Sequence, residues 1–158
     1  MSRWNVLLVL LLFNVCHAGE LSMPGSRTVA AADVGAVSRK PEERRMWMTI
    51  GDRRFSLTLA DNEAARAFVS LLPLTLDMGD LNANEKHVKL PKSLPSNASR
   101  PGTIRNGDLM LYGTDTLVVF YLTFDSPYSY TPLGRVDDPS ALVQALGRGD
   151  VRIVFSRN

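Results

Sequence analysis

The chain has 158 residues, with 18 basic and 16 acidic side chains and a formal net charge of +2. From Met46 onward, acidic and basic residues are equal in number, and no basic stretch is interleaved with aromatic residues. This pattern disfavours a nucleic-acid partner. One cysteine and two histidines are too few for an internal disulfide or a histidine-rich metal centre, so we expect neither a metal site nor a cofactor.

The first residues have the features of a secretory signal peptide. Arg3 supplies a positive charge, an apolar run from Val6 to Phe13 follows, and Ala18 offers a small residue for cleavage. The apolar run is too short to span a bilayer comfortably. We therefore expect residues 1–18 to be removed and the protein to be exported, either to a bacterial periplasm or into the medium. Cleavage would also remove Cys16, the single cysteine.

Two other fates of the leader remain open. It could stay attached as an anchor, which is the one way in which we expect the protein to meet a membrane. It could also be a lipoprotein signal that uses Cys16, although Val15 is larger than the residue that normally precedes such a cysteine. Residues 19–45 are predicted to be a flexible linker, because they lack apolar periodicity and could not bury enough surface to become ordered. A tether of this kind fits a cleaved or an anchored protein.

Residues 46–158 are predicted to form one domain made mainly of short strands. Alternating apolar residues separated by turn residues indicate strands, and Pro73 is expected to end the first helix. The run from Leu117 to Phe124 is apolar apart from Thr123, which predicts burial on both of its faces. The expected elements are strands at 46–50, 55–59, 74–78, 87–90, 108–112, 117–124 and 151–155, a helix capped by Asp61, and a second helix capped by Asp138 and ended by Gly147.

Two helices among about eight short strands, without a β-α-β alternation, predict a closed or nearly closed barrel with helices at its ends. Four segments also carry a family likeness: Leu72–Met78, Gly107–Gly113, Leu117–Tyr121 and Tyr128–Val136. Together they resemble the small bacterial cyclophilin-like domain family, over about residues 46–155. The resemblance implies a mainly β fold, a closed antiparallel eight-stranded barrel with two helices.

The resemblance also raises the question of prolyl isomerisation. True cyclophilins carry a Phe-x-Arg-x-x-x-x-Phe-x-x-Gln signature, which places an arginine over the prolyl nitrogen beside an apolar pocket, and this chain lacks that signature. The reaction needs no nucleophile and no metal, because a hydrogen bond to the amide nitrogen and a fixed proline ring can lower the rotation barrier. We therefore assign no catalytic residue.

Candidate ligand-binding residues are three tyrosines, one arginine and one glutamate. Tyr112, Tyr128 and Tyr130 could form an apolar pocket with polar tips. Arg135 follows two of them on one segment, although an arginine there could equally pair with Asp137 or Asp138. Glu85 could act as a general base or ligand anchor, or could simply belong to a polar hairpin.

These observations favour an exported, non-catalytic module that binds a peptide or a small-molecule ligand. The alternative is a periplasmic peptidyl-prolyl cis-trans isomerase that assists folding. A third possibility is an interaction protein whose barrel edge pairs with a strand of another chain.

Overall fold

The computed structural model describes residues 41–157. The predicted signal peptide and the predicted linker as far as residue 40 lie outside the described residues. The elements in chain order are η1 (Pro41–Arg44), β1 (Arg45–Ile50), β2 (Arg53–Leu59), α1 (Glu63–Val69), β3 (Leu74–Leu81), β4 (Glu85–Lys89), β5 (Gly102–Ile104), β6 (Asp108–Tyr112), β7 (Thr116–Phe120), β8 (Phe124–Ser126), β9 (Thr131–Val136), α2 (Leu142–Leu146) and β10 (Val151–Ser156).

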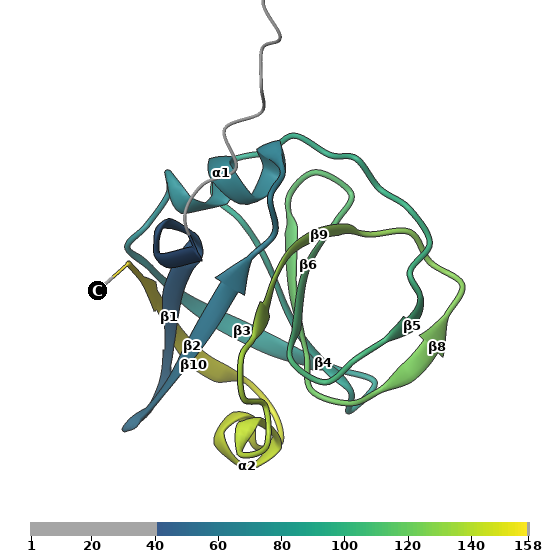
Figure 1. Ribbon diagram of the computed structural model, residues 1–158. Helices are drawn as coiled ribbons and strands as arrows, with labels where there is room; N and C mark the ends of the chain where they lie inside the picture. Colours follow the sequence, from purple (N-terminus) through teal and green to yellow (C-terminus); the bar gives the residue numbers. More distant parts are fainter. Residues whose placement is uncertain (1–40, 158) are drawn as a thin grey trace, which may run out of the picture. The chain divides into compact units, whose positions relative to one another are not determined.

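Eight of these strands close into a barrel in the order β1-β10-β3-β4-β7-β6-β9-β2. All of their pairings are antiparallel. The predicted mainly β fold, a closed antiparallel eight-stranded barrel accompanied by two helices, is therefore confirmed for residues 41–157. Figure 1 shows α1 and α2 at opposite ends of the barrel strands.

The first hairpin begins earlier than predicted. β1 and β2 pair through the turn at Gly51, whose φ of 59° lies in the left-handed region that glycine adopts without strain. β1 starts at Arg45 and a short 3-10 turn precedes it, so residues 41–45 belong to the ordered structure rather than to the predicted linker.

The N-termini of both helices differ from prediction. Asn62, not Asp61, caps α1, because its side-chain oxygen accepts a hydrogen bond from the Ala65 amide at 2.8 Å. Asp138 accepts from the Ser140 amide in the turn before α2, and this helix begins later, after Ala141. Gly147 ends α2 as predicted, with φ of 57°.

The barrel interior holds the main apolar core. α1 closes one end, where the Phe68 ring meets Phe155 edge-on with centroids 5.8 Å apart. α2 contributes Leu142 and Leu146 to the same core. The core packs the inward residues of the strands against both helices, which is how a small barrel avoids an empty interior.

β7 is buried on both faces, as its apolar sequence predicted. Leu117 and Val119 belong to the barrel core, whereas Val118 and Phe120 belong to a second cluster outside the barrel. Successive side chains of a strand point to opposite faces, so a continuous apolar strand needs cover on both sides.

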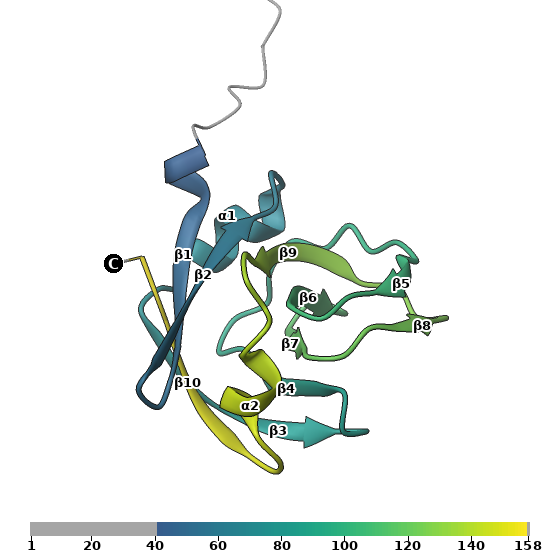
Figure 2. The ribbon, with the colours of Figure 1, turned by 60° about the horizontal axis from the view of Figure 1, so that its bottom comes forward.

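A two-stranded sheet made of β5 and β8 supplies the outer cover. The predicted strand from Leu117 to Phe124 is therefore wrong in one respect: β7 ends at Phe120, and the chain resumes as β8 in the separate sheet. Figure 2 shows β5 and β8 beside β6 and β7. Ile104 of β5 and Phe124 of β8 pack into the second cluster.

Candidate functional site

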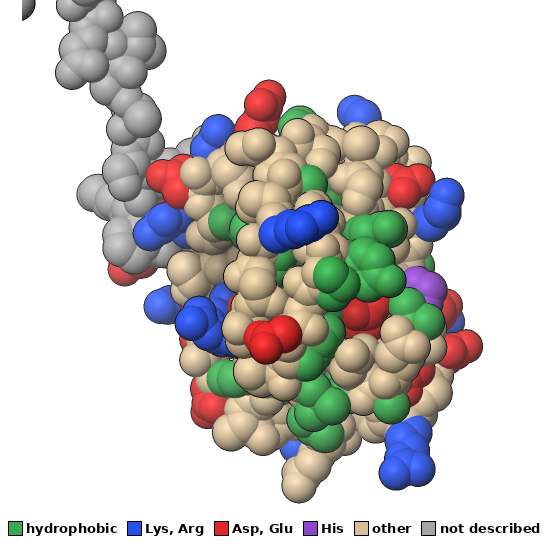
Figure 3. Space-filling view, turned by 90° about the vertical axis from the view of Figure 1, so that its right-hand side faces the viewer, with side chains coloured by type: hydrophobic (Ala, Val, Ile, Leu, Met, Phe, Trp, Pro, Cys, Tyr) green, Lys and Arg blue, Asp and Glu red, His purple; other side chains and the backbone are tan. Residues whose placement is uncertain are grey.

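The candidate site is a cavity of about 560 Å³ on the outer face of the barrel. Its floor is the outward side of β4, β6 and β7, and its walls are the β3–β4 turn and the segment from β8 to Tyr130. Figure 3 views this side of the molecule, where hydrophobic side chains border a hollow in which acidic side chains are visible. The floor residues are Glu85, His87, Tyr112, Thr116 and Val118, and the wall residues are Leu81, Asn82, Asn84, Phe124, Asp125, Ser126, Pro127, Tyr128 and Tyr130.

The three predicted tyrosines meet in this cavity. The Tyr112 and Tyr128 rings stand nearly perpendicular, at 88°, with centroids 6.4 Å apart. Tyr130 is buried beside Tyr112, with ring centroids 5.6 Å apart, and it also contacts Phe120 of the second cluster edge-on. Tyr112 and Tyr128 remain 48% and 59% exposed, so their ring faces are open to a ligand.

Glu85 also lines the cavity, and its environment is unusual for a carboxylate. The residue is only 9% exposed, and within residues 41–157 its carboxylate has no hydrogen-bond or ion-pair partner. Burial raises the pKa of Glu85 above its ordinary value, because desolvation penalises the charged form. The pKa of Tyr130 is raised as well, first by burial and then by the negative charge of Glu85.

Arg135 is the one predicted site residue that does not line the cavity. It lies opposite Asp108 on the neighbouring strand β6, and its Nε is 3.6 Å from a carboxylate oxygen of Asp108. Neither predicted partner is used: Asp137 accepts a hydrogen bond from the Thr58 hydroxyl at 2.6 Å, and Asp138 accepts from the Ser140 amide. Arg135 follows the tyrosines in sequence, but its position on strand β9 places its side chain beside Asp108 and outside the cavity.

Several polar residues that line the cavity were not among the predicted site residues, and His87, Asn84 and Asp125 are three of them. His87 lies two positions after Glu85 on β4, so both side chains share the outward face. Asn84 has a buried side-chain oxygen without a hydrogen-bond partner among the described residues. Asp125 of β8 accepts from the Thr103 hydroxyl at 2.7 Å. Alternation along β4 could have indicated that His87 shares the face of Glu85. The positions of Asn84 and Asp125 could not be predicted in this way, because they depend on the β3–β4 turn and on the β5–β8 pairing.

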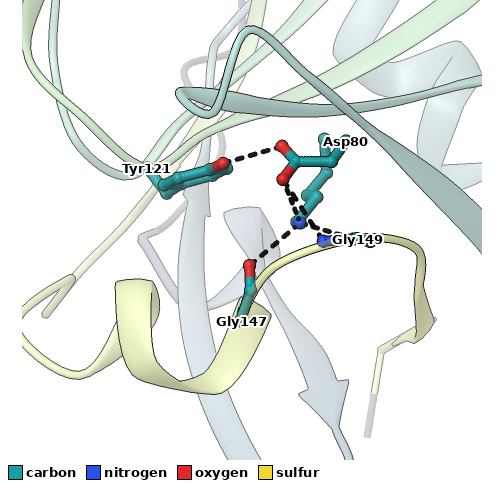
Figure 4. A network of polar contacts seen from close by, with 5 residues as sticks. Asp80, Tyr121, Gly147 and Gly149 are labelled. Atoms are coloured by element: carbon teal, nitrogen blue, oxygen red, sulfur yellow. Dashed lines mark hydrogen bonds and ion pairs between the residues drawn. The ribbon is translucent and has the colours of Figure 1, made fainter.

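Lys86 points the other way, into the end of the barrel, and it is completely buried. Its ammonium donates to the carbonyls of Gly147 at 3.0 Å and Gly149 at 2.7 Å, and lies 3.3 Å from a carboxylate oxygen of Asp80. Tyr121 donates its hydroxyl to the same carboxylate at 2.7 Å. Figure 4 shows this network between the strands and the turn that follows α2.

The network shifts the titration of two of its members. The hydrogen bond from Tyr121, aided by the Lys86 ammonium, lowers the pKa of Asp80. Burial and the hydrogen bond to Asp80 raise the pKa of Tyr121 to about 12. Lys86 therefore neutralises Asp80, whereas Glu85, its neighbour in sequence, has no counter-charge among residues 41–157.

Two other features, a metal site and a membrane-spanning helix, are not found in the part of the chain that the structure describes. Among residues 41–157, no three acidic, histidine or cysteine side chains come together in a way that could hold a metal ion. No helix in that range is both long and apolar enough to cross a bilayer.

Comparison with known proteins agrees with the fold and with the motifs. The model of the cyclophilin-like family matches residues 48–156, a range that begins within β1 and contains the other seven barrel strands in full. The chain belongs to the cyclophilin-like family. A search of curated proteins found no match. The solution structure of the hypothetical protein AF2241 from Archaeoglobus fulgidus is similar to this cyclophilin-like chain, with a TM-score of 0.50 and 15% sequence identity, over 77% of this chain and 99% of that chain. At this identity the likeness concerns the fold alone.

Proposed function

We propose that this protein is an exported, non-catalytic binding module that holds a peptide or a small-molecule ligand in the outer cavity. The observation that carries the proposal is the cavity itself, about 560 Å³ of space bordered by aromatic rings and a few polar groups. Small-molecule sites commonly measure about 300–1,000 Å³ and combine apolar walls with a small number of polar groups.

The position of the cavity supports binding. It lies outside the barrel core, beside the second cluster through which the β5–β8 sheet packs on the outer face of β6 and β7. Two of its tyrosines are roughly half exposed although their rings touch each other. Aromatic side chains of this kind offer a large contact area at a low cost in conformational entropy.

A fragment screen by two-dimensional amide NMR tests this function. A collection of cationic, anionic and neutral fragments of matched size is added to the protein. We expect most binding fragments to shift amides of β4, β8 and the Pro127–Tyr130 segment, because these residues border the cavity. Binding that is confined to other surfaces, or no binding by any fragment, would contradict the proposal.

Peptidyl-prolyl isomerisation is the alternative, and the cavity lacks the group that this reaction would use. Neither arginine nor lysine occurs among the residues that line it, and Arg135 lies outside it, paired with Asp108. We therefore expect the cis-trans exchange rate of a short Ala-Pro peptide, measured by exchange NMR, to be unchanged at high protein concentration. Faster exchange would overturn the non-catalytic assignment.

Export is the second part of the proposal, and it rests on the sequence of residues 1–18. Intact-mass spectrometry of the protein recovered from the periplasm or the medium is expected to show a chain that starts at Gly19. Recovery of the full-length chain from the membrane fraction would support the retained anchor. Recovery from the cytoplasm alone would contradict export.

A further inference from the structure

The charge of the cavity points to the kind of ligand. Its lining includes the carboxylates of Glu85 and Asp125 and one histidine, His87, while no lysine or arginine is among the lining residues. Asp125 already accepts a hydrogen bond from Thr103. Among the described residues Glu85 has no hydrogen-bond donor of this kind, so the two acids differ in what a ligand could offer them.

A bound cation would offset the desolvation cost of the buried Glu85 carboxylate. Its side chain is about nine-tenths buried and borders the cavity, yet within residues 41–157 nothing donates to its carboxylate. A buried carboxylate without a counter-charge is costly, and an opposite charge brought close to it favours the ionised form. Lys86 cannot supply that charge, because its side chain lies inside the barrel and is held by Gly147 and Gly149.

The tyrosines add a second feature that suits a positive charge. The Tyr112 and Tyr128 rings lie at about a right angle, edge against face, and both residues are roughly half exposed. Aromatic faces carry partial negative charge and attract ammonium and guanidinium groups, and perpendicular rings can contact one cation from two sides. Val118 and Phe124 supply apolar surface beside them for the chain that carries the charge.

We propose that the cavity takes an organic cation, an ammonium or guanidinium group on an apolar chain, with Glu85 as its counter-charge and Tyr112 and Tyr128 against its sides. This inference rests on the binding function proposed above and names the chemical class of its ligand. The cation could be a free amine or a lysine or arginine side chain of a peptide, and the two sources share the same recognition chemistry.

Matched probes separate charge from shape. 2-Phenylethylamine is cationic at neutral pH, 2-phenylethanol is its neutral analogue, and 3-phenylpropionate is an anion of similar size. We expect the amine to bind at least about tenfold more tightly than the alcohol, and the anion not to bind, because a charged hydrogen bond exceeds a neutral one by that margin. Affinities are measured by NMR titration of amides that border the cavity.

A peptide arm distinguishes the two sources of the cation. A blocked Ala-Lys-Ala peptide is compared with the same peptide carrying norleucine in place of lysine. Tighter binding of the lysine peptide than of the free amine indicates a peptide ligand. The reverse order indicates a small amine.

The decisive variant is Glu85→Gln, which removes the charge and keeps the shape. We expect it to abolish the preference for the amine while the alcohol binds as before. Glu63→Gln is the matched control, because Glu63 is an exposed residue of α1 that does not line the cavity. A preference for the amine that persists in Glu85→Gln would overturn the inference.

A measurement on the unaltered protein covers the case in which the variant is poorly folded. The pKa of Glu85 is measured from the pH dependence of the NMR chemical shift of its carboxyl carbon, with and without saturating amine. We expect the amine to lower the pKa of Glu85, since the bound cation favours the carboxylate. An unchanged titration would contradict the inference. The other titratable groups that line the cavity are His87 of β4, Tyr112 of β6, Asp125 of β8, and Tyr128 and Tyr130 before β9.

The outcomes for the two proposals are distinct. If neutral fragments fill the cavity as well as cations do, the cation inference fails and the binding function stands. If no fragment of any charge binds there, both fail.

Discussion

Lys86 occupies an inward position of β4 although it carries a charge. It lies opposite Val119, which belongs to the barrel core, and alternation along the strand directs both side chains inward. A lysine can be buried there because the turn after α2 presents two carbonyls, at Gly147 and Gly149, to its ammonium. The conformation of that turn therefore depends on a residue about sixty positions earlier in the chain.

Removal of this lysine is expected to weaken the fold. Lys86→Met keeps most of the apolar stem but leaves two carbonyls without their donor and Asp80 without its counter-charge. A hydrogen bond from a charged donor contributes about 1.5–3 kcal/mol, and water can partly replace the donor because Gly147 and Gly149 are exposed. We therefore expect a loss of about 2–4 kcal/mol in the free energy of unfolding. Denaturant unfolding followed by circular dichroism measures it.

Lys89→Met is the control on the same strand. Lys89 is 80% exposed and pairs with Asp115 on the surface, so its loss is expected to change stability by roughly 0.5 kcal/mol or less. If both variants unfold at the same denaturant concentration as the wild type, the Lys86 network does not stabilise the barrel end.

At the scale of elements, β2 and β9 lie so close together at Gly134 that there is no room for the Cβ atom of any other residue. A Cβ atom at Gly134 would lie 2.7 Å from the carbonyl oxygen of Thr58 and 3.2 Å from the Cα of Leu59. Both are backbone atoms, so the strands themselves would have to move apart. This pairing closes the barrel between β2 and β9.

Gly134→Ala is therefore expected to destabilise the barrel by about 1–3 kcal/mol, the usual cost of inserting a group into packed structure. Thermal or denaturant unfolding measures the change. Gly79→Ala on β3 is the control, because its new Cβ would meet side-chain atoms no closer than 3.6 Å. Equal stability of the two variants would show that the β2–β9 approach tolerates a side chain.

The strand β4 places opposite charges on its two faces. Glu85 and His87 point outward to the cavity, while Lys86 between them points inward to the barrel end. Since the period of a strand is two residues, a shift of one residue in its pairing would exchange these roles. The pairings of β4 with β3 and β7 thus decide which charged side chain lines the outer cavity and which is neutralised inside the barrel.

At the scale of the whole molecule, two apolar clusters share β6 and β7. The barrel core lies on one face of these strands, and the second cluster lies on the other, beneath β5 and β8. The cavity lies beside the second cluster, and three segments that are distant in sequence form it: residues 81–87, 112–118 and 124–130. A peripheral sheet packed on a closed barrel therefore creates a binding-sized space without disturbing the core.

The barrel could be predicted from the sequence because the signals for it are local. Alternating apolar residues, the Gly51 turn and the Gly147 helix end each act within a few residues, and each occurs where it was expected. The four family segments placed these elements in one architecture. The helix caps at Asp61 and Asp138 were wrong, since a neighbouring asparagine and a later helix start satisfied the backbone instead.

The cavity could be predicted only in part. Tyr112, Tyr128, Tyr130 and Glu85 were chosen for their chemistry, and the structure brings these four together. Arg135 was chosen for its nearness in sequence, but the pairing of β9 with β6 places it against Asp108.

The sequence by itself indicated most of the barrel strands, the turn at Gly51, the end of α2 at Gly147 and the family, because hydrophobic period and turn chemistry act between neighbours in the chain. Only the tertiary structure decided which charges are neutralised. Lys86 meets Asp80, Arg135 meets Asp108 and Glu85 meets no cation among the described residues, since each of these outcomes depends on strand pairing and on the closure of the barrel.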